Sequence, residues 1–173
     1  MIEHTIAVLN DVGGVGLNIT DHYKMYLIQN LAVDLRYRHT WYGSPISEGL
    51  DETLREYFTG GRASYDKRIE RLVLKESVKK DLTRVNKISI PPEEISRDKW
   101  LELLSTIHYF RNVCCVKKGP TLTFSELNQN RAVICAKDKN RQFNRQEFDL
   151  AWQRLEQFGL LDRKHNRVNY TAS

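Results

Sequence analysis

Apolar residues recur at helical spacing through most of the chain, most clearly over residues 145–158. One face of that segment would carry Phe148, Ala151, Trp152 and Leu155. Asn144 and Glu147 precede and open it with the N-cap and N3 spacing of a capping box. Gly159 follows where a left-handed residue closes many helices. The pattern therefore predicts an amphipathic helix with defined ends.

The segments on either side of this helix suggest a winged helix-turn-helix. Residues 96–114 keep a 3.6-residue apolar period over four turns and predict a central packing helix that Ser96 can start. A second capping box, Thr123 with Glu126, predicts another helix before residue 145. After Gly159, Leu160 and Leu161 begin a strand, residues 162–166 form a polar turn, and residues 167–170 alternate as a returning strand. Three helices followed by a strand, a turn and a strand are typical of that fold.

The N-terminal half is also mainly helical by pattern. Helices are predicted near Ile2 to Leu9, over residues 21–33 with Thr20 as cap, and over residues 48–58 with Ser47 as cap. The alternation at residues 36–42 predicts a strand. Residues 68–75 fit either a strand or the opening of a helix, and the pattern does not separate the two.

These elements predict a mainly α fold with small β-hairpins, in the α+β sense, built around winged helix-turn-helix-like units. Pro91 and Pro92 mark the most convincing internal boundary. We divide the chain there into an N-terminal helical region, residues 1–90, and a winged-helix-like region, residues 91–173, with one compact unit as the alternative. Residues 20–74 loosely repeat helix, strand, helix, and a tandem arrangement is a hypothesis.

Composition and charge restrict the function. The chain has 173 residues, 40% of them hydrophobic and 28% charged, which is ordinary for a globular protein. It has no apolar run long enough for a membrane span, and its three cysteines have neither disulfide nor zinc spacing, so a cytoplasmic protein is expected. Residues 1–60 hold 4 Lys and Arg against 8 Asp and Glu, whereas residues 61–90 hold 9 against 4. Basic segments of this kind are compatible with a polyanionic partner.

One stretch resembles a known family. Residues 24–54, KMYLIQNLAVDLRYRHTWYGSPISEGLDETL, place a buried helix before an aromatic strand, a Tyr-Gly-Pro-like turn and another helix. This block is similar to that of Panacea-type antitoxin domains and related small prokaryotic proteins, and residues 101–110 and 148–161 are similar to their later helices. Trp41, Tyr42, Gly43 and Pro45 match the family's turn, although Ser44 interrupts the usual Gly-Pro order.

The resemblance implies a mostly helical fold and a role in toxin–antitoxin systems or in defence against mobile elements. That role would be carried out by binding a partner protein or DNA. It implies no catalytic residue. The matched turn serves equally well as scaffold or as interaction surface.

Motif spacing indicates neither an enzyme nor a cofactor. The five histidines form no H-E-x-x-H pair, and the sequence contains no P-loop, nucleotide-binding glycine fingerprint or G-x-S-x-G motif. Adjacent carboxylates such as Glu93 and Glu94 point apart on a helix. We therefore predict no catalytic residue, no metal site and no cofactor.

Nucleic-acid binding is the chemistry that remains. Candidate base readers on the helix at 145–158 are Arg145, Gln146, Gln153 and Arg154, although that helix has a net charge of −1. Candidate phosphate contacts in the following turn are Arg163, Lys164, His165 and Arg167. A second basic patch comprises Lys75, Lys79, Lys80, Arg84 and Lys87. If this patch and the turn lie on one surface, nonspecific binding to duplex DNA is favoured; if they lie on opposite faces, solubility is the simpler purpose.

Two functions are consistent with these patterns. The first is a non-catalytic DNA-binding or regulatory protein of antitoxin or defence type that contacts double-stranded DNA. The second is a protein-interaction subunit whose acidic N-terminal half docks a toxin or another enzyme and does not contact nucleic acid. The sequence names neither the partner nor the oligomeric state.

Overall fold

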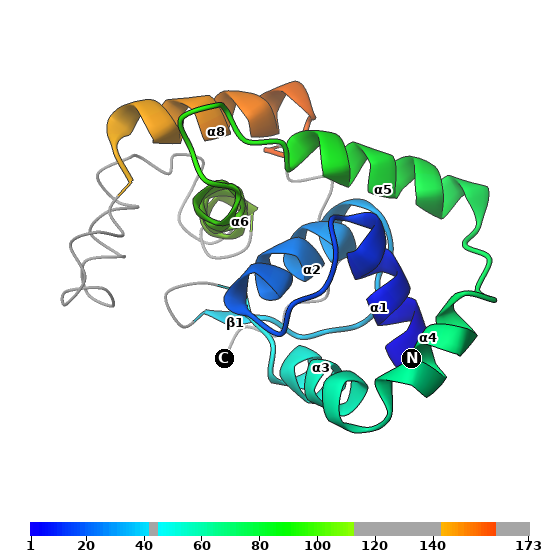
Figure 1. Ribbon diagram of the computed structural model, residues 1–173. Coiled ribbons are helices and arrows are strands. Elements are labelled where there is room, and N and C mark those ends of the chain that lie inside the picture. The colour runs from blue at the N-terminus through cyan, green and yellow to red at the C-terminus, as the bar shows by residue number, and fades with distance from the viewer. Residues whose placement is uncertain (42–44, 113–142, 162–173) are drawn as a thin grey trace.

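The computed structural model describes residues 1–41, 45–112 and 143–161, and this part of the chain is mostly helical (Figure 1). Its helices are α1 (Ile2–Asp11), α2 (Ile19–Leu31), α3 (Glu48–Thr59), α4 (Arg62–Ile69), α5 (Glu76–Ile88), α6 (Arg97–Asn112) and α8 (Arg145–Gln157). Two short strands, β1 (Thr40–Trp41) and β2 (Pro45–Ile46), pair antiparallel. The predicted mainly helical class is confirmed. The predicted helix after Thr123 and the hairpin beyond Leu161 lie outside the described residues.

Helix α2 lies at the centre of the molecule (Figure 1). Every residue from Thr20 to Leu31 is buried, as the apolar residues around its circumference predict. Its N-cap is Asn18 and not Thr20, so the predicted cap was wrong by two residues. Asn18 accepts a hydrogen bond from the amide of Thr20, and Asp21 at the N3 position completes a capping box with it. Asparagine is as good a cap as threonine, and the acidic N3 residue decides between them.

Helix α6 packs against α2 on one side and α8 on the other, which confirms the predicted central helix. The side chains of Trp100, Leu103, Leu104 and Ile107 are fully buried. One hydrophobic cluster joins residues from before and after Pro91 and Pro92, so the core is continuous across the predicted boundary. Helix α8 buries Phe148, Ala151 and Leu155 and has the predicted Asn144–Glu147 capping box. Gly159 closes it in the left-handed conformation with φ of 67°.

Among the described residues, the strand predicted at residues 36–42 is paired at Thr40 and Trp41. Residue 36 has a left-handed backbone with φ of 62°, which interrupts an extended segment. The backbone of Tyr37 is then bound by a side chain: its amide donates to Gln29 Oε1 at 2.7 Å, and its carbonyl accepts from Gln29 Nε2 at 2.9 Å. The Gln29 amide from α2 therefore takes the place of a neighbouring strand.

The segment at residues 68–75 is neither of the two predicted alternatives. Helix α4 ends at Ile69, a turn and an extended connection follow, and α5 begins only at Glu76. Ile69 and Leu74 pack partly buried against the core without any strand pairing in the described ranges. Leu160 and Leu161 are likewise buried but not in a strand, so that prediction was wrong. These residues pack against the core because they are apolar. A β-strand also requires hydrogen bonds to a neighbouring strand, which apolar content does not supply.

Candidate nucleic-acid interface

The basic patch lies along the outer face of α5. Leu82, Val85 and Ile88 turn one side of this helix into the core. The 3.6-residue period directs Lys79, Lys80 and Lys87 to the opposite side, where all three are exposed. Lys75 is exposed just before the helix begins. The hydrophobic side of α5 thus sets the direction in which its cations point.

Lys79, Lys80 and Lys87 line a shallow hollow of about 710 Å³ between α5 and the end of α8. The lining residues are Glu76, Ser77, Lys79, Lys80, Asp81, Thr83, Arg84, Lys87 and Phe158. Four cations face two carboxylates in this lining, and one carboxylate is already paired, since Lys79 Nζ lies 3.5 Å from Glu76 Oε2. The hollow is therefore net positive, which suits a multivalent anion.

Arg84 connects the patch to the C-terminal end of α8. It is half-buried, and its guanidinium donates a hydrogen bond to the carbonyl oxygen of Phe158. Figure 1 shows α5 and α8 along the same side of the molecule. The basic row thus lies beside the point where the chain leaves α8. The predicted phosphate contacts from Arg163 to Arg167 begin two residues after Leu161 but lie outside the described residues.

The two arginines predicted to read bases from α8 are engaged within the protein. Arg154 Nη1 donates to the carbonyls of Lys87 and Ile90 at 3.0 and 3.2 Å, and its guanidinium lies over the Trp100 ring. Arg145 is exposed and forms an ion pair with Asp149 at 3.0 Å. We therefore omit Arg154 from the contact surface. Its guanidinium instead joins α8 to the end of α5 through these hydrogen bonds.

The exposed face of α8 has little that attracts a phosphate backbone. Gln146 and Gln153 are exposed, as a recognition helix requires. The same face carries Glu156 and the paired Arg145 and Asp149. This face is net negative, so α8 is a poorer anion-binding surface than α5.

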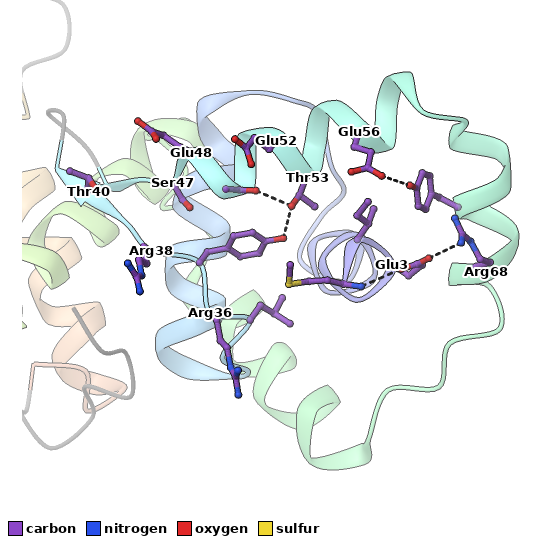
Figure 2. A pocket seen from close by; sticks show the side chains of 16 residues that line it. Glu3, Arg36, Arg38, Thr40, Ser47, Glu48, Glu52, Thr53, Glu56 and Arg68 are labelled. Atoms are coloured by element: carbon purple, nitrogen blue, oxygen red, sulfur yellow. Dashed lines mark hydrogen bonds and ion pairs between the residues drawn. The ribbon is translucent and has the colours of Figure 1, made fainter. Parts of the chain in front are cut away.

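A second, larger hollow lies between α1, α3, α4 and the chain at residues 35–40 (Figure 2). Its volume is about 1060 Å³. Glu48, Glu52 and Glu56 line it at successive turns of α3, with Arg36 and Arg38 on another side. The sequence reading missed this acidic row, although its i, i+4, i+8 spacing was available as a signal.

Several charges in this second hollow already have partners. Arg68 binds Glu3 at 3.2 Å, and Tyr65 donates to Glu56 at 2.8 Å. The bond to Glu56 raises the pKa of the Tyr65 hydroxyl. Hydrogen bonding from the backbone, with Arg68 adding to it, lowers the pKa of Glu3. Glu48 and Glu52 remain exposed, without an ion pair in the described part of the chain.

The family-like turn is described only at its two ends. Trp41 in β1 lies opposite Pro45 in β2, so the chain reverses between them. Tyr42 and Gly43 lie outside the described residues. The turn joins the central helix region to the start of α3, where Ser47 caps the helix by accepting from the amide of Leu50. Pro45 is buried, which fits a scaffold role for this end of the turn.

Three buried histidines lie along or beside α2. His22 Nδ1 accepts from the amide of Ser47, and its Nε2 donates to Asp51 at 3.1 Å. Tyr26 hydrogen-bonds His108 at 2.7 Å and packs edge-on against His39. Both ring nitrogens of His22 are thus used in joining α2 to α3. These arrangements tie helices together and leave no ring nitrogen of His22 for proton transfer to a substrate.

His39 should make the protein less stable in acid. Burial, and then the nearby His22, lower the pKa of His39 from 6.5 to about 4. The unfolded chain therefore binds more protons below pH 6.5, and stability should fall by about 2–3 kcal/mol as the pH drops from 6.5 to 4. Urea unfolding at a series of pH values measures this change. The His39→Gln variant should lose less stability over that range; an identical pH profile would contradict the assignment.

Within the described ranges, no group of three His, Cys, Asp or Glu residues is arranged to hold a metal ion. None of the helices in those ranges has the length and apolar character to cross a membrane.

No protein-family model, curated protein or solved structure matches the chain. The similarity to Panacea-type antitoxin domains therefore stays a prediction from the sequence.

Proposed function

We propose that this chain is a non-catalytic DNA-binding or regulatory protein of antitoxin or defence type that acts in the cytoplasm. Its contact surface comprises the α5 row, Lys75, Lys79, Lys80 and Lys87, together with the basic segment from Arg163 to Arg167. The observation that supports it is the exposed row of lysines around a net positive hollow. Lysines on one helix face release counterions when they meet phosphates, which favours binding.

The position of α5 relative to α8 supports this surface over the helix at 145–157. Arg84 binds the carbonyl of Phe158 at the end of α8, beside the lysine row. The sequence alone left open whether the two basic groups share a surface. If the two basic groups share one surface, duplex binding explains the charges better than solubility alone does.

Neutralising the row should remove DNA binding without unfolding the protein. The variant Lys79→Gln/Lys80→Gln/Lys87→Gln should bind a 20-base-pair duplex at least tenfold more weakly at low salt, measured by fluorescence anisotropy. Its unfolding temperature should change little, because all three side chains are exposed. The matched control is Arg38→Gln/Arg55→Gln/Lys67→Gln. It loses the same charge from exposed positions that do not line the α5 hollow. Equal effects of the two variants would contradict the proposal.

The second candidate is a protein-interaction subunit that docks a toxin or another enzyme. The row formed by Glu48, Glu52 and Glu56 beside a large hollow favours it, because exposed carboxylates at successive helical turns can bind a basic partner. The same titration decides between the candidates. A docking subunit shows no duplex binding in either variant or in the parent protein.

A further inference from the structure

We propose that the α5 surface binds the phosphate backbone of double-stranded DNA and reads no bases, so that binding is independent of sequence. This inference rests on the proposed function and specifies its ligand. It follows from which side chains remain available on α5 and α8, and from the kinds of side chain that the surface lacks.

The exposed cations on α5 are lysines, of which Lys79 pairs with Glu76 at 3.5 Å. Lys79, Lys80 and Lys87 carry compact charges that contact phosphates well but lack the flat, forked geometry of arginine. From Lys79 to Lys87 the helix rises about 12 Å, which is close to the width of a major groove. The row can therefore reach phosphates that border the groove while its short exposed neighbours, Ser77 and Thr83, stay back from the bases.

Of the side chains on α5 and α8 that could read bases bidentately, the asparagine and the arginines contact other groups of the protein, and Gln146 and Gln153 lie on the net negative face of α8. On α5, Asn86 donates to the carbonyl of Asp11 at 2.6 Å and Arg84 donates to that of Phe158. On α8, Arg154 is bound to the carbonyls at the end of α5, and Arg145 is paired with Asp149. These contacts hold the helices together. They also remove the arginine and asparagine groups that give most direct readout.

The surface lacks what single-stranded nucleic acid needs. Proteins that bind single strands stack bases on exposed aromatic rings. The large hydrophobic side chains exposed in the described ranges are Met1, Leu17, Ile19, Val73 and Ile90, and none of them is aromatic. Phe158, which lines the hollow, is half-buried. A regular double helix, which offers phosphates without unstacked bases, fits this surface better.

The test measures binding of the full chain to four 20-base-pair duplexes of different sequence, to one matching single strand, and to phosphatidylcholine vesicles containing phosphatidylserine. Each duplex titration is repeated over a salt series. We expect affinities for the duplexes to agree within about threefold and to exceed that for the single strand. Lys79→Gln/Lys80→Gln/Lys87→Gln should reduce the slope of log affinity against log salt by about 3, since each phosphate contact contributes about 0.9. The variant Gln146→Ala/Gln153→Ala should bind as the parent does.

Two results would overturn the inference and leave the proposed function intact. One is a tenfold or greater preference among the duplexes that Gln146→Ala/Gln153→Ala abolishes, which would show base reading by α8. The other is a stronger affinity for the single strand than for any duplex. Absence of duplex binding at low salt would overturn the proposed function as well. Binding to the vesicles without binding to duplexes would assign the lysines to an anionic membrane surface instead.

Discussion

Replacing Trp100 with alanine should lower the free energy of unfolding by about 3–5 kcal/mol. Trp100 is the largest fully buried side chain of α6, and its indole nitrogen donates to the carbonyl of Ile88 at 2.9 Å. The same ring supports the guanidinium of Arg154. Removing it leaves a cavity where α5, α6 and α8 meet, and leaves the buried Ile88 carbonyl with fewer partners.

Thermal and urea unfolding followed by circular dichroism measure this loss. For a chain of this size it corresponds to a fall of roughly 6–20 °C in unfolding temperature. Trp152→Ala is the matched control, because Trp152 lies on α8 and is only half-buried, and it should cost clearly less. Trp100→Phe, which keeps a ring but loses the donor, should fall between the two. Similar losses for Trp100→Ala and Trp152→Ala would show that the three helices do not depend on this ring.

Breaking the buried ion pair between Asp21 and Lys24 should cost about 3–5 kcal/mol. Neither side chain is more than 7% exposed, and Lys24 Nζ lies 3.1 Å from Asp21 Oδ1. Lys24 also donates to the carbonyl of Gly14 at 2.7 Å, while Asp21 accepts from the amide of Gly16 at 2.9 Å. The pair therefore holds the glycine-rich loop against α2. Asp21→Asn leaves a buried ammonium without its counter-charge.

A double-mutant cycle separates the pair from its surroundings. Asp21→Asn and Lys24→Met should each be strongly destabilising, and the double variant should cost less than the sum of the two. The control is Asp149→Asn, which breaks the exposed Arg145–Asp149 pair and should change stability by less than about 1 kcal/mol. If the two single losses add without coupling in urea unfolding, the ion pair is not what holds the loop.

The same loop shows why a glycine is required at residue 13. Its backbone has φ of 90°, and a Cβ built there would lie 2.4 Å from the Arg97 guanidinium. That guanidinium donates to the carbonyl of Val12 at 3.0 Å. In the structure, Arg97 at the start of α6 and Lys24 on α2 both bind this loop, so contacts from distant residues fix it.

Helix positions were the part of the fold that the sequence predicted best. The capping pairs at Asn144 and Ser47 have the predicted geometry because a cap and its amide partners lie within a few residues of each other. The strand predicted at residues 36–42 is present at Thr40 and Trp41 but not at Tyr37, for the opposite reason. A strand needs a partner, and the partner of Tyr37 is the Gln29 side chain, a contact that no local pattern encodes.

The candidate site was predicted only as a set of residues. The sequence identified the cations of α5 and the arginines of α8 equally, because all are polar positions on amphipathic helices. The structure separates them: the lysines of α5 are exposed, whereas Arg154 binds the carbonyls at the end of α5. It also shows the acidic row on α3 beside a hollow whose other sides are α1, α4 and the chain at residues 35–40.

The sequence by itself determined that this chain is mainly helical, where several of the described helices begin and end, and which face of α8 turns inward. These properties depend on caps and on a 3.6-residue period, which act over a few residues. Only the tertiary structure decided which charges remain available and that the α5 row lies beside the end of α8. Those properties depend on contacts between residues more than 60 positions apart, such as Arg84 with Phe158 and Arg154 with Lys87.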